Sequence, residues 1–241
     1  MTQGISRSFS RGPDDLRPVS VELGAAPYAE GSCLIAMGST RVLCSASVEE
    51  TAPGWRRGSG KGWVTAEYAM LPRATHTRTS RERGNLGGRT QEIQRLVGRS
   101  LRACVDLAAL GERTIRIDCD VLQADGGTRT AAITGGSLAL QHACDWLVHN
   151  GLLSKTPFRT RVAAVSVGVV GGDVLLDLDY SEDSVAEVDL NVVALDGGGL
   201  VEVQGTAERA PFSVEQLQQM VSLANGGIGR LFDLQRDVLG S

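Results

Sequence analysis

The chain has 241 residues, of which 42% are hydrophobic, and it carries a net charge of −4 at pH 7. This length suffices for one large domain or two fused halves with a full hydrophobic core. The weak negative charge gives no overall case for nucleic-acid binding, and no apolar run is long enough for a transmembrane helix. The N-terminus lacks the apolar core of a signal peptide, so we expect a soluble, cytoplasmic protein.

The first half of the chain begins with the alternating pattern of β-strands and then changes to a helical period. Strands are predicted over residues 19–23, 32–37, 41–48, 64–71 and 114–122, with a hairpin at Gly38-Ser39. A glycine-rich basic loop over 51–62 and a long charged loop over 72–88 interrupt them. Apolar periodicity predicts one helix from Thr90 to near Gly111 and a second from Thr128 to His149.

The second half repeats this order of elements. Strands are predicted over residues 162–169, 174–179, 188–194 and 200–204, with a turn at Gly171-Gly172. A final helix begins at Ser213, where Gln216 completes a capping box, and ends near Val238. We therefore predict an α+β fold, a single domain of two similar halves over roughly 16–150 and 160–238, rather than a parallel βαβ sheet.

Charge is strongly polarised along the chain. Residues 73–102 hold eight arginines against two glutamates, whereas residues 173–208 hold ten acidic residues and neither Lys nor Arg. The basic stretch also holds Thr, Ser and His side chains that suit phosphodiester oxygens, and its loop lacks aromatic residues for base stacking. This composition favours sequence-independent binding of a nucleic-acid backbone over a merely solvated loop.

Two glycine–arginine turns precede the first two predicted helices, at Gly87-Gly88-Arg89-Thr90 and Gly126-Gly127-Thr128-Arg129-Thr130. Each places an arginine and unpaired backbone N–H groups at a helix N-terminus, which favours an anion. The alternative is a tight turn for close packing, since neither matches a P-loop or dinucleotide fingerprint.

Six acidic residues lie between Asp177 and Asp189. Apolar neighbours place Asp189 on a strand that enters the core, where a carboxylate needs a counter-charge or a metal. Asp183 and Asp189 are thus candidates to share one Mg²⁺, and the alternative is a solvated strand edge. The five cysteines form no C-x-x-C pair and are expected to be buried free thiols, and we expect no role for His142 and His149.

Motifs along nearly the whole chain resemble the ribonuclease PH family of phosphorolytic exoribonucleases, which is related to polynucleotide phosphorylase and exosome ring subunits. The motifs are Leu16-Arg17-Pro18-Val19, residues 62–73, residues 87–96, residues 125–130, residues 182–192 and Gln204-Gly205-Thr206-Ala207-Glu208. The resemblance implies that Arg89, Gly127, Thr128 and Arg129 bind the attacking phosphate. It also implies that Asp183 and Asp189 are the catalytic and metal-binding pair, and that Arg73, Arg78 and Arg81 bind RNA.

The family further implies a nucleotidyltransferase that uses Mg²⁺ and releases nucleoside diphosphates from RNA 3′ ends. Its expected substrates are tRNA precursors and also rRNA, with no DNA and no membrane partner, and its expected assembly is a homohexamer built as a trimer of dimers. The alternatives are an inactive ring-forming RNA-binding subunit and a small-molecule phosphotransferase. Two departures are Arg209, which stands where the family has glycine, and Gly135-Gly136, whose helix is expected to lose about 1 kcal/mol per glycine relative to alanine.

Overall fold

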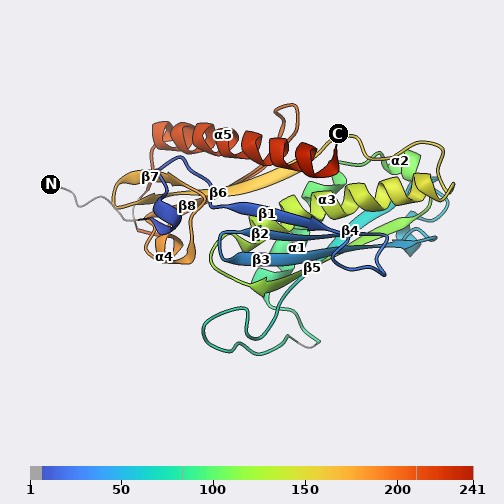
Figure 1. The fold of residues 1–241 in the computed structure, drawn as a ribbon, viewed down its shortest axis with the longest axis horizontal. Helices are drawn as coiled ribbons and strands as arrows, with labels where there is room; N and C mark the ends of the chain where they lie inside the picture. The colour runs from blue at the N-terminus through green and yellow to red at the C-terminus, as the bar shows by residue number, and fades with distance from the viewer. Residues whose placement is uncertain (1–6, 83, 210, 241) are drawn as a thin grey trace.

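A computed structural model describes residues 7–82, 84–209 and 211–240. Its described residues form two β-sheets with helices packed between and over them (Figure 1). The α+β fold predicted from the alternation of strand and helix patterns is confirmed. The elements appear in the predicted order, apart from two local differences given below.

The first sheet has the strand order β1-β2-β3-β5-β4. Its strands are β1 (Val19–Leu23), β2 (Gly31–Met37), β3 (Thr40–Glu49), β4 (Trp63–Met70) and β5 (Thr114–Gln123). The β2–β3 hairpin closes at Gly38, whose φ of 57° suits glycine. Only β4 and β5 run parallel in this sheet as described. This pair is an exception to the expected lack of βαβ pairing, because helix α1 (Gly88–Arg102) carries the chain across between them.

The second sheet is antiparallel throughout its described strands, in the order β7-β6-β8-β9. Its strands are β6 (Val162–Val170), β7 (Asp173–Leu176), β8 (Val188–Leu195) and β9 (Leu200–Ala207). Helix α5 (Val214–Leu239) packs on β6, β7 and β8. The capping box predicted at its start is confirmed, since the Ser213 hydroxyl accepts from the Gln216 amide and the Gln216 side chain accepts from the Ser213 amide.

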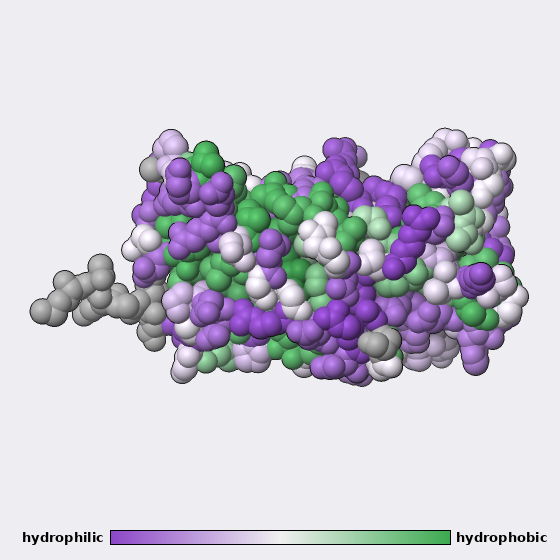
Figure 2. Space-filling model, turned by 90° about the horizontal axis from the view of Figure 1, so that it is seen from above, coloured by the Kyte–Doolittle hydropathy of each residue, from purple (hydrophilic) through white to green (hydrophobic). Residues whose placement is uncertain are grey.

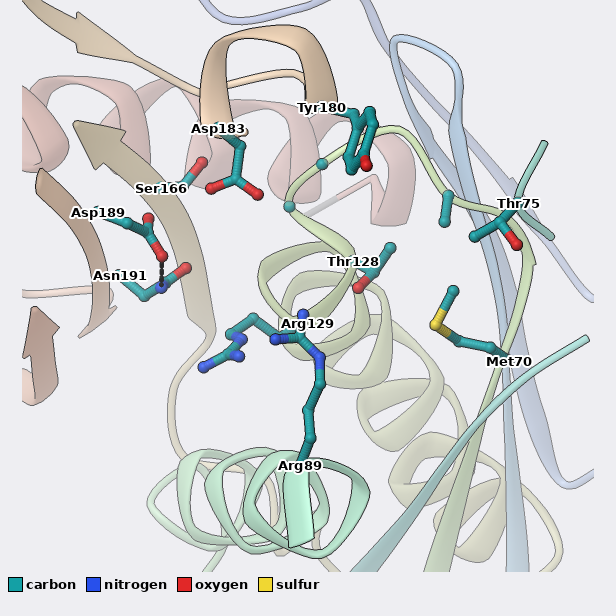
Figure 3. Close-up of a pocket in the computed structure, with 13 residues that line it drawn as sticks. Met70, Thr75, Arg89, Thr128, Arg129, Ser166, Tyr180, Asp183, Asp189 and Asn191 are labelled. Atoms are coloured by element: carbon teal, nitrogen blue, oxygen red, sulfur yellow. Dashed lines mark hydrogen bonds between the residues drawn. The ribbon is translucent and has the colours of Figure 1, made fainter. Parts of the chain in front are cut away.

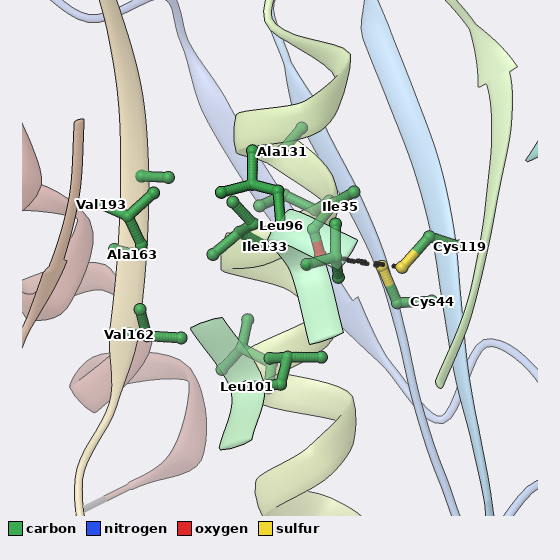
Figure 4. Close-up of a cluster of buried hydrophobic side chains, with 14 of the residues drawn as sticks. Ile35, Cys44, Leu96, Leu101, Cys119, Ala131, Ile133, Val162, Ala163 and Val193 are labelled. Carbon is green, nitrogen blue, oxygen red and sulfur yellow. Dashed lines mark hydrogen bonds between the residues drawn. The ribbon is translucent and has the colours of Figure 1, made fainter. Parts of the chain in front are cut away.

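Helix α3 (Thr128–His149) is the central element of the fold. It packs against β2 and β3 of the first sheet, against β6 of the second and against α1. Most residues of α3 are buried, and the buried residues lie on all of its faces, as expected for a helix enclosed by other layers. One hydrophobic core therefore joins both halves, and Figure 4 shows Ile133 of α3 between Ile35 and Ala163.

Buried thiols belong to this core. All five cysteines are buried and free, as predicted, and burial raises the pKa of Cys33 and Cys104 to about 12. The thiols of Cys44 and Cys119 both donate to the Ala132 carbonyl of α3 at 3.8 Å (Figure 4). These cysteines therefore serve as small apolar side chains between sheet and helix.

Two predicted elements are wrong in extent. The helix expected to reach Gly111 ends at Arg102, and a separate turn α2 (Leu107–Leu110) follows, capped by the Asp106 side chain. The helix breaks because Val105 bridges Phe158 and the Asp106 amide donates to the Pro157 carbonyl. The strand expected over 174–179 ends at Leu176, because Asp177 has a φ of 54° and a helical turn α4 (Tyr180–Asp183) follows.

The remaining short elements are the 3₁₀ turns η1 (Ser8–Ser10) and η2 (Gly54–Arg56). Within the described chain, no helix is both long and apolar enough to cross a bilayer. Viewed from the α5 side, the surface gathers hydrophobic side chains over the region of that helix, and hydrophilic ones border them (Figure 2).

Candidate active site

A cavity of about 310 Å³ lies where the two halves meet. Its lining comes from β4, the 71–87 loop, α1, the turn before α3, the first two residues of α3, β6, α4 and β8. These residues are Met70, Thr75, Arg89, Ala124, Gly126, Gly127, Thr128, Arg129, Ser166, Tyr180, Asp183, Asp189 and Asn191. Figure 3 shows Arg89 and Arg129 reaching into the pocket from one side, and Asp183 and Asp189 facing it from the other.

The turn before α3 brings backbone amides to this cavity. Gly126 and Gly127 have φ values of 75° and 62°, so the two-glycine turn is left-handed at both positions. Gly127 is the N-cap residue, and no side chain in the described ranges caps the helix. The first amides of α3 thus keep their hydrogen-bonding capacity for an anion. The Tyr68 hydroxyl lies 2.8 Å from Thr128 Oγ1, and this hydrogen bond fixes the threonine side chain.

Arg89 and Arg129 are the two cations of the pocket. Arg89 is the second residue of α1 and is exposed, whereas Arg129 is the second residue of α3 and is half-buried. Arg129 Nη1 donates to Gln204 Oε1 at 2.9 Å and to Glu92 Oε1 at 3.4 Å. Gln204 Nε2 in turn donates to Glu92 Oε1 at 3.2 Å. These three hydrogen bonds orient the Arg129 guanidinium through its Nη1. Arg129 also lines the cavity, so within the described chain its other N–H groups are left for a ligand.

The two carboxyl groups come from separate elements of the second half. Asp183 is the last residue of α4, and Asp189 lies on β8, where Asn191 Nδ2 donates to its Oδ2 at 3.4 Å. Desolvation and then repulsion by Asp183 raise the pKa of Asp189 to about 6, and Arg129 opposes the shift. Desolvation also raises the pKa of Asp183, and Arg89 and Arg129 again oppose. Desolvation and mutual repulsion therefore outweigh the attraction of the two arginines, so ionising these carboxyl groups costs more than ionising exposed aspartates.

The described part of the chain offers no metal site built wholly from protein ligands. No group of three or more His, Cys, Asp or Glu side chains suited to a metal occurs among the residues that the structure describes. Two carboxylates facing one cavity do fit Mg²⁺, which retains several waters and commonly takes its other oxygen ligands from a phosphate substrate.

The predicted RNA-binding arginines lie beside this pocket rather than in it. Arg73 lines a neighbouring cavity of about 500 Å³ together with Thr75 and His76, and Thr75 also lines the first cavity. Arg78 and Arg81 are exposed on the segment between β4 and α1, which projects from the body of the molecule (Figure 1). Arg83 of the same basic run lies outside the described residues.

Several residues in the pocket or directly behind it were not identified from the sequence. Glu92 and Gln204 orient Arg129, and Asn191 contacts Asp189, although all three stand inside the motifs that carried the family resemblance. Tyr180 and Ser166 line the cavity without a recognisable local pattern. The departure at Arg209 falls after the end of β9 on an exposed residue, and Arg209 is not among the residues that line the cavity as described.

Comparisons with known sequences cover nearly the whole chain. Residues 15–144 match the profile of the 3′ exoribonuclease family, domain 1, and residues 160–227 match that of domain 2. The chain is 60% identical over 235 residues to a ribonuclease PH of Methylobacterium radiotolerans, covering 97% of this chain and 99% of that protein. A ribonuclease PH of Methylobacterium nodulans is 58% identical over 236 residues, covering 97% and 100%.

Solved structures share the fold at lower identity. Rrp46 of rice (Oryza sativa) superposes with a TM-score of 0.79 at 20% identity, covering 97% of this chain and all of that one. A chain of the Archaeoglobus fulgidus exosome with RNA bound to the active site gives a TM-score of 0.79 at 21% identity, covering 94% and 91%. Both show that the two-sheet arrangement recurs in distant proteins.

Proposed function

Because this chain belongs to the 3′ exoribonuclease family, we propose that it is a phosphorolytic 3′–5′ exoribonuclease, a nucleotidyltransferase that uses inorganic phosphate. One observation carries the proposal: a single cavity faces the uncapped N-terminus of α3, two arginines and two carboxyl groups. The first two features suit a phosphate dianion, and the carboxyl pair suits the other half of a phosphoryl-transfer site.

The reaction joins two anions, so its main barrier is to bring them together in line. Arg89, Arg129 and the α3 amides neutralise and orient the phosphate. A phosphate oxygen attacks the phosphorus of the last phosphodiester, the bond from that phosphorus to the 3′ oxygen of the preceding nucleotide breaks, and a nucleoside diphosphate leaves. The shortened RNA retains the 3′ oxygen, which gains a proton, and we assign that proton transfer to the Asp183/Asp189 pair.

We also propose that Mg²⁺ binds to Asp183 and Asp189. When bound, the ion supplies positive charge that stabilises the transferring phosphate and the departing oxygen. Desolvation and then repulsion by Asp183 raise the pKa of Asp189, and a divalent cation held by these residues would supply the charge that relieves both effects, which supports this proposal.

Three finer features complete the proposal. Arg73, Arg78 and Arg81 guide the RNA 3′ end through backbone phosphates, because they are exposed on or beside the loop next to the cavity. The substrates are 3′ extensions of tRNA precursors, and of rRNA precursors, processed in the cytoplasm. The assembly is a homohexamer, and the hydrophobic surface near α5 supports an interface there (Figure 2).

Phosphate dependence tests the proposed reaction directly. An oligoribonucleotide labelled at its 3′-terminal nucleotide is incubated with the protein and Mg²⁺, with and without inorganic phosphate. We expect a labelled nucleoside diphosphate only when phosphate is present, and extension of the RNA when excess nucleoside diphosphate replaces phosphate. Release of a monophosphate would mean hydrolysis, and an RNA of unchanged length would favour an inactive binding subunit or a small-molecule phosphotransferase.

A further inference from the structure

Arg17 is buried between the two halves of the pocket without lining it among the described residues. Its side chain is fully shielded from solvent, as is that of Asp177. Arg17 Nη2 donates to Asp177 Oδ1 at 2.7 Å, and Nε donates to Oδ2 at 3.1 Å. The backbone amide of Arg17 donates to the same Oδ2 at 2.8 Å, so this carboxylate is held on both oxygens.

The other end of the guanidinium contacts the turn before α3, residues 125–127, which we call the phosphate turn. Arg17 Nη1 donates to the Asp125 carbonyl at 2.6 Å and to the Gly126 carbonyl at 3.4 Å. Gly127, which follows directly, is the N-cap of α3. One side chain thus contacts both the turn that precedes Thr128 and Arg129 and the acid at the end of β7.

Asp177 in turn determines how the second half approaches the pocket. Its φ of 54° is strained for a residue with a side chain, and it turns the chain from β7 toward α4, which ends at Asp183. The Asp177 amide donates to the Ser166 carbonyl at 2.7 Å, which fixes the backbone on the side of β6. The contact with Arg17 fixes it on the side of the phosphate turn.

The phosphate turn and the segment that follows Asp177 are tightly packed against each other. A Cβ atom added at Gly126 would lie 2.6 Å from the Leu178 carbonyl oxygen, and one added at Gly127 would lie 2.8 Å from Arg17 Nη2. The Tyr180 amide also donates to Asp125 Oδ1 at 3.4 Å. A shift of the phosphate turn would therefore move the segment that carries Asp183.

The same N-terminal segment holds α4 from its other side. Arg7 Nε donates to Glu182 Oε1 at 2.7 Å, and Arg11 Nη2 donates to Glu182 Oε2 at 3.3 Å. Both pairs are buried. Glu182 immediately precedes Asp183, so the segment contacts both ends of the connection between Asp177 and Asp183.

We propose that the Arg17–Asp177 pair is a positioning unit, which holds the phosphate turn at a fixed place relative to Asp183. This inference rests on the proposed phosphorolytic function. Neither residue is among the described residues that line the cavity. The pair acts on both binding and rate. A displaced turn presents the α3 amides out of place relative to the arginines, which weakens phosphate binding, and it holds the bound phosphate out of line with the bond to be cleaved, which slows the reaction.

The variants Arg17→Lys, Asp177→Asn and the double variant test this role. Lysine retains the charge but lacks the planar fork, so it cannot hold both Asp177 oxygens and the two carbonyls together. For Arg17→Lys we expect kcat/KM for phosphate to fall about tenfold or more, while KM for RNA stays within about twofold. The double variant should lose little more than Arg17→Lys alone, because both changes break one unit.

Gln235→Met is the matched control. Gln235 is also fully buried and also joins the halves, since its Nε2 donates to the carbonyls of Thr134 and Val162 at 3.1 Å each. The kinetic constants of the variants are compared with those of Gln235→Met, and the Tm of each protein is measured so that a loss of stability is accounted for. The proposal is overturned if Arg17→Lys loses no more kcat/KM for phosphate than this control, or if KM for RNA rises as much as KM for phosphate.

Failure of the proposed function would look different. In that case the wild-type protein itself would release no nucleoside diphosphate, whatever the variants do. Calorimetric titration with inorganic phosphate then tests the positioning role by itself. We expect Arg17→Lys to bind phosphate more weakly than Gln235→Met does, and equal affinities would overturn the role.

Discussion

Asp189 carries a charge that the folded protein disfavours at neutral pH. Its folded-state pKa of about 6 exceeds the value of about 3.9 of an unfolded aspartate, so folding takes up a proton between these pH values. The contribution of Asp189 to stability therefore falls as pH rises from about 4 to about 6, and the loss persists above that, with an upper bound of about 3 kcal/mol. We expect Asp189→Asn, which cannot ionise, to be more stable than wild type at pH 8 and equally stable near pH 4, as measured by urea unfolding.

Two controls accompany this prediction. Asp173→Asn changes an exposed aspartate on β7 and should leave the pH dependence unchanged. Mg²⁺ at pH 8 should stabilise the wild type but not Asp189→Asn, because a ligand stabilises only the protein that binds it. An Asp189→Asn protein no more stable than wild type at pH 8 in the absence of Mg²⁺ would contradict the unfavourable charge.

At the scale of the element, two adjacent glycines of α3 have opposite surroundings. Helix propensity alone predicts a gain from replacing either with alanine. A Cβ at Gly135, however, would lie 2.7 Å from Ile35 Cγ2 and 3.1 Å from Cys44 Sγ, both in the buried sheet. We expect Gly135→Ala to lower the free energy of unfolding by about 1–3 kcal/mol, because the close packing of helix on sheet leaves no room.

Gly136→Ala is the matched control on the same helix. Its added Cβ would meet Leu101 Cδ1 at 3.3 Å, the end of a flexible side chain. We expect this variant to be neutral or more stable by up to about 1 kcal/mol, through the better helix propensity of alanine. Chemical denaturation of both variants decides the matter, and a stabilised Gly135→Ala would show that propensity outweighs packing here.

At the scale of the whole molecule, opposite charges occupy different places although the net charge is small. The exposed arginines of the projecting loop stand beside a pocket whose far side is acidic. We expect Arg78→Ala/Arg81→Ala to raise KM for RNA while leaving kcat at saturating RNA unchanged. The slope of log affinity against log salt should become shallower by about 0.7 for each phosphate of the single strand that the protein no longer neutralises.

Lys155→Ala removes an exposed positive charge outside the loop and serves as the control. Binding of a fluorescent oligoribonucleotide across a range of salt concentrations gives the slopes. If Lys155→Ala and the double variant change the slope equally, general charge rather than the loop attracts the RNA.

Local patterns were sufficient to predict most of the fold. The hairpin at Gly38, the capping box at Ser213 and the helix that begins at Thr128 all depend on residues close together in sequence. The glycine–arginine turns were found for the same reason, since each is a contiguous motif directly before a helix. Their presence in one pocket with Asp183 and Asp189 required the family resemblance, because spacing does not say which loops meet.

Long-range contacts explain what the sequence did not predict. Helix α1 stops at Arg102 because residues 105–106 pair with residues 157–158, about fifty positions away. The chain turns at Asp177 because its carboxylate is held by Arg17, 160 positions earlier. Neither partner leaves a trace in local periodicity, and Arg17 stood out only as part of a motif.

Helix α3 begins at the reactive pocket and continues as the buried centre of the core. The phosphate side of the pocket therefore has no hinge of its own, since displacing the α3 N-terminus would disturb the packing of both sheets. The RNA side is an exposed loop with few buried residues. Successive rounds of cleavage thus require only the RNA strand to advance. The N-terminus of α3 stays in place while one nucleotide after another reaches it.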